Sequence, residues 1–224
     1  MPRAGLTPDR VLAVAGDLAD EVGLDRLTLA MVAERCGVAL PSLYKHVAGL
    51  DAVRRGLAVA GAVELGNRLG AAAVGRSGRA ALHAVADAYR AFAHERPGRY
   101  AASVRAPADG DQEHAAAARG PYEVVRAVVD GYPVRSRSTV DAVRGLRSAV
   151  HGFVALEAAG GFGLPEDLDR SFAELVAVFD RAWSAAPGDG SGQDVSVEDG
   201  EGWDDRGGVR AVDGAAGLRG APVR

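Results

Sequence analysis

The chain has 224 residues with 26 basic and 30 acidic side chains, a net charge of −4, and a hydrophobic fraction of 48%. This length suits one or two domains with a sizeable core, and the composition is typical of a soluble globular protein. The small negative charge excludes a polybasic nucleic-acid binder, so DNA binding would need a local basic patch. No run of about 18 uninterrupted apolar residues is present, so we expect no membrane span.

The compartment and the C-terminal segment can be predicted from residue usage. Cys36 is the single cysteine, which excludes an internal disulfide and a multi-cysteine zinc site within one chain. Residues 1–10 lack the apolar core of a signal peptide, so we expect a cytoplasmic location. Residues 185–224 are rich in glycine and hold four basic and eight acidic side chains, which predicts a disordered tail.

The remainder of the chain is expected to be helical throughout. Alanine is abundant and isoleucine is absent, which favours an all-α fold of about nine helices. Thr7, followed by Pro8 and Asp9, is expected to cap the first helix, and Gly37 is expected to end the second in the left-handed conformation. Apolar periodicity and turn residues predict helices over 8–22, 29–36, 41–46, 50 onward, 79–95, 100–104, 111–130, 138–159 and 166–184.

The first three predicted helices have the spacing of a helix-turn-helix unit, with Gly37 in the turn. In the third helix Leu43 and Val47 are expected to face the core. The chain's single lysine, Lys45, is on the opposite side among hydroxyl and imidazole groups that can reach phosphates and base edges in a major groove. Between residues 35 and 55 there are four basic side chains and one acidic one, which predicts a local positive patch.

The stretch from Thr7 to about Val53 resembles the DNA-binding domain of the TetR family of bacterial transcriptional regulators. The resemblance is carried by VLAVAGDLADEVGLDRLTLAMVAERCGV and by LPSLYKHV. It implies a homodimeric repressor that binds a palindromic double-stranded DNA operator and is released by a small-molecule effector. The residues expected to contact DNA are Thr28, Leu40, Pro41, Ser42, Tyr44, Lys45 and His46, with Arg54 as an additional cation.

Two positions depart from the family pattern. Ala39 stands where a polar cap often precedes the third helix, and Ala48-Gly49-Leu50 stands where a lysine is common. Without that lysine one expected phosphate contact is missing, and Arg54 or Arg55 is a candidate to replace it. The departures leave open an alternative function, a helical ligand-binding or protein-interaction module that has lost specific DNA binding.

The C-terminal half resembles the ligand-binding and dimerisation domain of the same family. RSAVHGFVALEAAGGFGLP, together with YAASVRAP, resembles the subclass named after a Trp-His-Gly motif, which here reads Val150-His151-Gly152. The implied organisation is a DNA-binding domain at 1–50, an effector-binding and dimerisation domain at 51–184, and the tail at 185–224. The residues expected near the effector are Tyr89, Phe92, Tyr100, Tyr122, Arg147 and His151, since aromatic side chains suit an apolar ligand.

Two further expectations concern the last two helices. Arg147 and His151 lie four residues apart, so they can either bind an anionic ligand group or form a buried polar link satisfied by Glu157 or by backbone. These helices also carry more apolar side chains than one domain needs, which predicts a dimer interface. Its expected members are Phe153, Leu156, Phe172, Leu175 and Phe179.

No catalytic constellation is apparent in the sequence. His94-Glu95 is followed by Arg96-Pro97 rather than by the rest of an HExxH zinc motif, and there is no GxSxG elbow or phosphate-binding GxxxxGK[ST] loop. The five histidines show no metal-ligand spacing, and His114, in an alanine-rich run, is expected to be solvated. We therefore expect no enzyme activity, metal or cofactor.

Overall fold

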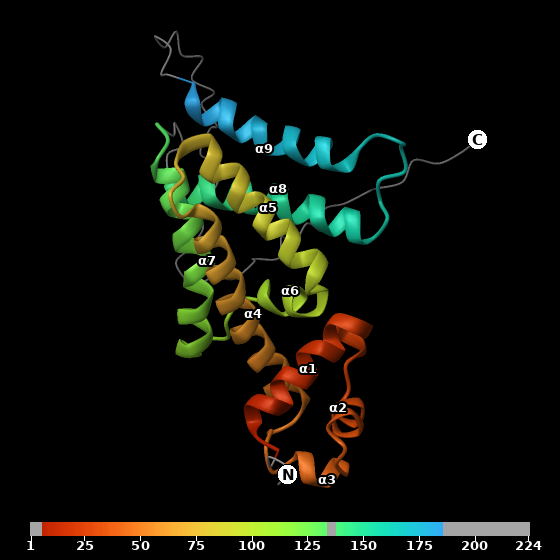
Figure 1. Ribbon diagram of the computed structural model, residues 1–224. Coiled ribbons are helices and arrows are strands. Elements are labelled where there is room, and N and C mark those ends of the chain that lie inside the picture. Colours follow the sequence, from red (N-terminus) through yellow and green to blue (C-terminus); the bar gives the residue numbers. More distant parts are fainter. Residues whose placement is uncertain (1–5, 134–137, 186–224) are drawn as a thin grey trace, which may run out of the picture. The chain divides into compact units, whose positions relative to one another are not determined.

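The computed structural model describes residues 6–133 and 138–185, and within these ranges the chain forms nine α-helices, one short 3-10 helix and no strand (Figure 1). None of these helices combines the length and the apolar character that a membrane span requires. The predicted tail beyond residue 185 lies outside the described residues. The helices are α1 (Pro8–Val22), α2 (Leu29–Cys36), α3 (Leu40–Leu43), α4 (Leu50–Ala73), α5 (Gly78–Glu95), α6 (Pro97–Ser103), α7 (Gln112–Asp130), α8 (Thr139–Ala158) and α9 (Leu168–Ser184), with the 3-10 helix η1 (Leu24–Arg26) between α1 and α2.

The predicted caps of the N-terminal helices are confirmed. The Thr7 hydroxyl accepts a hydrogen bond from the Arg10 backbone N–H at 3.2 Å and satisfies a donor that the first turn of α1 leaves free. Gly37 ends α2 in the left-handed conformation, with φ of 70°. Fully buried side chains then join α1, α2, α3 and the start of α4 into one core: Val11, Leu27, Val32, Leu43 and Val53.

The third helix is shorter than the sequence predicts. It ends at Leu43, and residues 44–46 form a tight turn instead of continuing the α-helix. In this turn the backbone N–H of Lys45 donates to Ser42 and that of His46 donates to Leu43, each three residues back. At the other end of α3 the Ala39 side chain has no group that could cap the helix, and α-helical geometry covers only Leu40–Leu43.

The start of α6 also differs from the prediction. Pro97 and Gly98 were expected to break the chain ahead of a helix at 100–104, whereas Pro97 occupies the first turn of α6. Pro at that position loses no hydrogen bond, because the first N–H groups of a helix have no partner within it. Gly98 is buried, and a Cβ atom there would collide with the backbone of Ala19 on α1.

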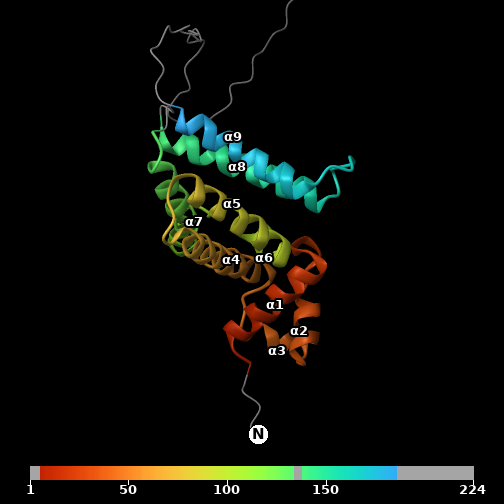
Figure 2. The same cartoon turned by 45° about the horizontal axis from the view of Figure 1, so that its top comes forward.

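Helix α4 lies against α5, α6 and α7, and α8 and α9 lie side by side (Figures 1 and 2). The predicted start of α9 at residue 166 is two residues early. The Asp167 carboxylate caps this helix by accepting hydrogen bonds from the N–H groups of Asp169 and Arg170 at 2.8 and 3.1 Å. A second core joins α4, α5, α7, α8 and α9, and its largest fully buried side chains are Leu69, Leu82, Phe92, Val129, Phe172 and Val176.

Candidate functional site

The turn that follows α3 presents polar and aromatic groups to solvent. Tyr44 is 56% exposed and Lys45 is exposed, while Ser42 and His46 are half-buried. Leu40 and Pro41 are exposed on the first turn of α3. These six side chains were predicted to contact DNA, and they lie within one short segment that Leu43 anchors in the core.

Thr28 combines an exposed position with a capping role. Its hydroxyl accepts a hydrogen bond from the Met31 backbone N–H at 3.3 Å and so caps α2. The N-terminus of a helix carries a partial positive charge that favours a nearby anion such as a phosphate. The position is therefore compatible with the predicted phosphate contact.

The two arginines at the start of α4 are bound within the chain. Arg54 is half-buried and donates to the carbonyl oxygen of Asp25 at 3.4 Å. The Arg55 guanidinium pairs with Asp111 at 2.6 Å and with Glu113 at 2.8 Å, both on the segment that starts α7. In contrast, Lys45 forms no ion pair within residues 6–133 and 138–185. The replacement anchor predicted at Arg54 or Arg55 would require these intramolecular contacts to break.

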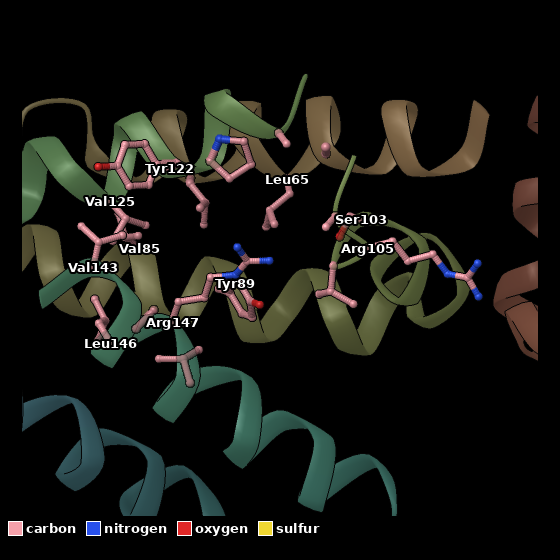
Figure 3. A pocket seen from close by; sticks show the side chains of 18 of the residues that line it. Leu65, Val85, Tyr89, Ser103, Arg105, Tyr122, Val125, Val143, Leu146 and Arg147 are labelled. Atoms are coloured by element: carbon pink, nitrogen blue, oxygen red, sulfur yellow. The ribbon is translucent and has the colours of Figure 1, made fainter. Parts of the chain in front are cut away.

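A cavity of about 260 Å³ lies among α4, α5, α7 and α8, next to the segment that links α6 to α7 (Figure 3). Most of its wall is aliphatic. In the sequence these aliphatic residues follow the helical periodicity of an ordinary core, so they were not predicted to line a cavity. Aliphatic side chains from four helices line it: Leu65, Leu69, Val85, Val125, Val143 and Leu146.

A few polar groups interrupt this apolar wall. Tyr89, Ser103, Arg105, Tyr122 and Arg147 line the cavity. Figure 3 shows the Arg147 side chain extending into it beside Tyr89, whereas Arg105 leads away from it. The Arg105 guanidinium lies 3.8 Å from the Asp25 carboxylate. Arg147 is an exposed residue, and it is the charged lining side chain that extends toward the cavity.

A chain of hydrogen bonds starts at the cavity wall. The Tyr89 hydroxyl lies 3.3 Å from the Tyr100 hydroxyl, which is hydrogen-bonded to Nδ1 of His151. Burial raises the pKa of Tyr89, although its hydrogen bond to Tyr100 and the nearby positive charge of Arg147 act in the opposite direction. Burial likewise raises the pKa of Tyr100. Both phenols therefore stay protonated at neutral pH and can donate hydrogen bonds.

The structure separates the six predicted pocket residues into two groups. Tyr89, Tyr122 and Arg147 line the cavity. Tyr100 and His151 lie behind Tyr89 in the hydrogen-bond chain, outside the lining. The sixth residue, Phe92, is fully buried with the guanidinium of Arg68 5.2 Å from its ring centre, so it belongs to the core.

The structure also bears on the two alternatives for Arg147 and His151, namely a site for an anionic ligand group and a buried polar link satisfied by Glu157 or by backbone. Glu157 does not link to either of them, because its carboxylate pairs with Arg90 at 2.5 Å and with His94 at 2.8 Å. Hydrogen bonding to Arg90 is the main cause that lowers the pKa of Glu157. His151 bonds Tyr100 instead, and no carboxylate among the described residues pairs with Arg147.

The predicted interface residues on α8 and α9 differ in how accessible they are. Leu156 is 52% exposed, and Phe153, Leu175 and Phe179 are half-buried. Phe172 is only 1% exposed and packs on Phe153 with ring centres 5.1 Å apart, so its surface is already used within the protomer. Val178, which the prediction did not include, is 52% exposed on α9.

Cys36 and His114 are two further titratable side chains, and neither lines the cavity. Among residues 6–133 and 138–185 no group of three His, Cys, Asp or Glu side chains is placed to hold a metal ion. Cys36 is half-buried against the first core, and burial raises the pKa of its thiol. His114 is 4% exposed, so the prediction that it is solvated is wrong: the side chain points into the protein from the first turn of α7.

Comparisons with known proteins agree with this arrangement. Residues 82–179 match the family model described as "Tetracyclin repressor-like, C-terminal domain". The chain is 33% identical to the uncharacterized HTH-type transcriptional regulator YobS of Bacillus subtilis, over 80% of this chain and 93% of that protein. It is 35% identical to the uncharacterized HTH-type transcriptional regulator Rv0681 of Mycobacterium tuberculosis, over 77% of this chain and 79% of that protein.

Two solved structures illustrate the similarity of fold. One is a protein of unknown function from Rhodococcus sp. RHA1, with a TM-score of 0.70 and 22% identity over 82% of this chain and 98% of that one. The other is a variant of TetR from Acinetobacter baumannii in complex with minocycline, with a TM-score of 0.58 and 26% identity over 81% of this chain and all of that one.

Proposed function

The chain belongs to the TetR family of helix-turn-helix transcriptional regulators, and we propose that it is a homodimeric repressor that a small-molecule effector releases from a palindromic operator. The observation that carries the DNA-binding part is the turn at Tyr44-Lys45-His46, in which Tyr44 and Lys45 are exposed and Lys45 has no ion-pair partner among the described residues. An unpaired cation beside exposed hydroxyls can exchange the counterions of a phosphate backbone for direct contacts.

The proposed operator contacts divide by chemistry. Tyr44 and His46, with the capped helix start at Thr28, would bind phosphates and position the unit on the duplex. Ser42 and Lys45 would reach base edges in the major groove, where lysine can recognise guanine. Leu40 and Pro41 would add apolar contact with thymine methyl groups. Arg54 contributes only if it leaves the carbonyl of Asp25.

The cavity among α4, α5, α7 and α8 is proposed as the effector site. Its apolar wall with a few polar groups is typical of a small-molecule pocket. Release would follow if the effector binds more tightly to a conformer whose two α3 segments no longer fit half-sites about 34–36 Å apart. The effector can shift this equilibrium only by its difference in affinity for the two conformers.

The proposed dimer uses the outer faces of α8 and α9, where Leu156 and Val178 are exposed. We also propose the Trp-His-Gly subclass, with His151 as the histidine of the motif. The hydrogen bond between His151 and Tyr100 supports this, because it joins the two stretches that carry the resemblance. The same proposal includes domain boundaries at residues 50 and 184 and a cytoplasmic location. It also includes the absence of catalytic activity, metal and cofactor.

The test is fluorescence anisotropy on DNA from upstream of the protein's own gene, at two salt concentrations and with excess unrelated DNA as competitor. We expect tight, competitor-resistant binding by the wild type. Lys45→Ala should weaken DNA binding and reduce the slope of log K against log salt concentration by about 1. The matched control is Arg10→Ala on α1, which removes one exposed cation outside the proposed DNA-contacting segment and should bind like the wild type.

A second function, a ligand-binding or interaction module without specific DNA binding, is favoured by Ala39 and by the missing lysine near Leu50. Selection from a random DNA library distinguishes it from the repressor. Enrichment of a palindromic sequence supports the repressor. Recovery of no preferred sequence, together with equal binding by wild type and Lys45→Ala, would establish the second function instead.

A further inference from the structure

We infer that the cavity binds a monocarboxylic acid with an apolar body, and that Arg147 pairs with its carboxylate. This inference rests on the proposed effector site and adds the chemical class of the effector. It follows from the placement of one positive charge without a carboxylate partner at the wall of a mostly apolar cavity (Figure 3).

The first argument is the state of the arginine. Some arginines of the fold are paired with carboxylates, such as Arg55 with Asp111 and Glu113, and Arg90 with Glu157 and Asp169. Arg147 differs from exposed arginines such as Arg144 because its side chain lines the cavity. No carboxylate pairs with Arg147 in the ranges that the structure describes. A cation at the edge of an apolar cavity is more favourable when an anion binds beside it, because the pairing replaces water that the ligand displaces.

The second argument concerns hydrogen bonding. The Tyr89 hydroxyl is close enough to Arg147 for the positive charge to act on its pKa. This phenol remains protonated at neutral pH, so its O–H can donate to a carboxylate oxygen. The hydroxyl of Tyr100 lies 3.3 Å away and can accept or donate in turn. A planar guanidinium with a neighbouring phenol matches the two oxygens of one carboxylate.

The third argument limits the size and charge of the ligand. A volume of about 260 Å³ lies just below the range of about 300–1,000 Å³ that is usual for small-molecule pockets, so the ligand should be small. Arg147 is the single charge directed into the space, since the guanidinium of Arg105 lies beside Asp25. One cation suits one negative charge better than a phosphate dianion. The side chains at Leu65, Val85 and Val143 would cover the apolar body of the ligand.

The experiment is isothermal titration of the full chain, without DNA, with benzoate, phenylacetate, hexanoate and octanoate. Each acid is paired with its neutral primary amide, and phenethylamine serves as the cationic probe. We expect at least one acid to bind and its amide to bind on the order of tenfold more weakly, which is the scale of a charge-assisted hydrogen-bonded pair.

Three variants on α8 locate the charge. Arg147→Gln should weaken binding of the acid by on the order of tenfold or more, and Arg147→Glu should bind phenethylamine in preference to phenylacetate. Arg144→Gln is the matched control, because Arg144 is an exposed arginine on the same helix that does not line the cavity. It should bind the acid like the wild type. Both positions are exposed, so these substitutions should not disturb folding, which circular dichroism checks.

The outcomes separate this inference from the effector role. The inference is overturned if no acid binds, if acid and amide bind equally, or if Arg147→Gln binds the acid as the wild type does. Anisotropy with the operator is measured separately in each case. An acid that binds through Arg147 without releasing DNA would support the carboxylate site but refute the proposal that the cavity is the effector site. Intact operator binding without acid binding would overturn only the carboxylate assignment.

Discussion

The Asp20 carboxylate accepts a hydrogen bond from the Gly98 backbone N–H at 2.9 Å, so a side chain of α1 caps the start of α6. The N–H of Arg99 donates to the same oxygen at 3.0 Å, and the Arg99 guanidinium pairs with the other oxygen. At its other end α6 finishes at Ser103, which lines the cavity. One seven-residue helix therefore contacts the helix-turn-helix unit at its start and the cavity at its end.

The close approach at Gly98 predicts a large effect of the smallest substitution. In Gly98→Ala the added Cβ would overlap the backbone of Ala19, so α1 and α6 would have to separate. We expect the free energy of unfolding to fall by about 1–3 kcal/mol, measured by urea denaturation. Gly70→Ala is the control, because its Cβ would meet only Val124 at an ordinary 3.9 Å. In Gly70→Ala the free energy of unfolding should rise by up to about 1 kcal/mol because alanine has the higher helix propensity. Equal effects of the two substitutions on the free energy of unfolding would refute the packing argument.

The ion pair between Arg55 and Asp111 predicts a specific pH dependence. Hydrogen bonding to Arg55, with a further bond from the His114 backbone N–H, lowers the pKa of Asp111 from 3.8 to about 2. A carboxylate whose folded pKa is lowered stabilises the fold above its unfolded pKa, and this contribution is lost as pH falls through about 2. The stability difference between wild type and Asp111→Asn, which keeps an oxygen to cap α7, should therefore shrink between about pH 4 and pH 2.

Acid titration of urea unfolding measures this difference. The control is Glu113→Gln, which removes the more exposed partner of the same arginine. It should change stability little, because exposed ion pairs contribute about 0–1 kcal/mol. A difference for Asp111→Asn that stays constant down to pH 2 would contradict the lowered pKa.

The two threonine caps predict an effect that separates stability from DNA binding. Thr7→Ala and Thr28→Ala each remove a hydroxyl that accepts from the backbone N–H three residues on, at 3.2 and 3.3 Å. Each should cost about 1 kcal/mol of stability. Only Thr28→Ala should also weaken operator binding in the anisotropy assay, because only Thr28 is a proposed phosphate contact. Equal operator affinity for both variants would remove Thr28 from the DNA-binding surface.

The exposed apolar side chains on α8 and α9 predict how the dimer can be broken. Leu156→Glu and Val178→Glu should each shift the protein toward monomer in sedimentation velocity, because a buried, unpaired charge opposes association. Val63→Glu is the control, as Val63 is a similarly exposed apolar residue on α4. If all three variants sediment like the wild type, the interface lies elsewhere.

The sequence by itself determined those features that depend on neighbouring residues. The ends of α1 and α2 were predicted because a threonine cap, a proline in the first turn and a glycine after the last turn act within a few residues of one another. The helix-turn-helix assignment had the same local origin. Tyr89, Tyr122 and Arg147 could be named as cavity candidates because large or charged side chains stand out against an aliphatic helix pattern.

Tertiary structure decided the features that depend on contacts between distant segments. Nothing in the sequence distinguishes Arg54 from its neighbour Arg55. In the structure the guanidinium of Arg54 bonds the carbonyl oxygen of Asp25, whereas that of Arg55 pairs with the Asp111 carboxylate. Helix α6 begins at Pro97 because Asp20, 77 positions earlier, caps it. The aliphatic wall of the cavity has the same periodicity as a filled core, and whether a space remains between such side chains is set by how four helices pack together.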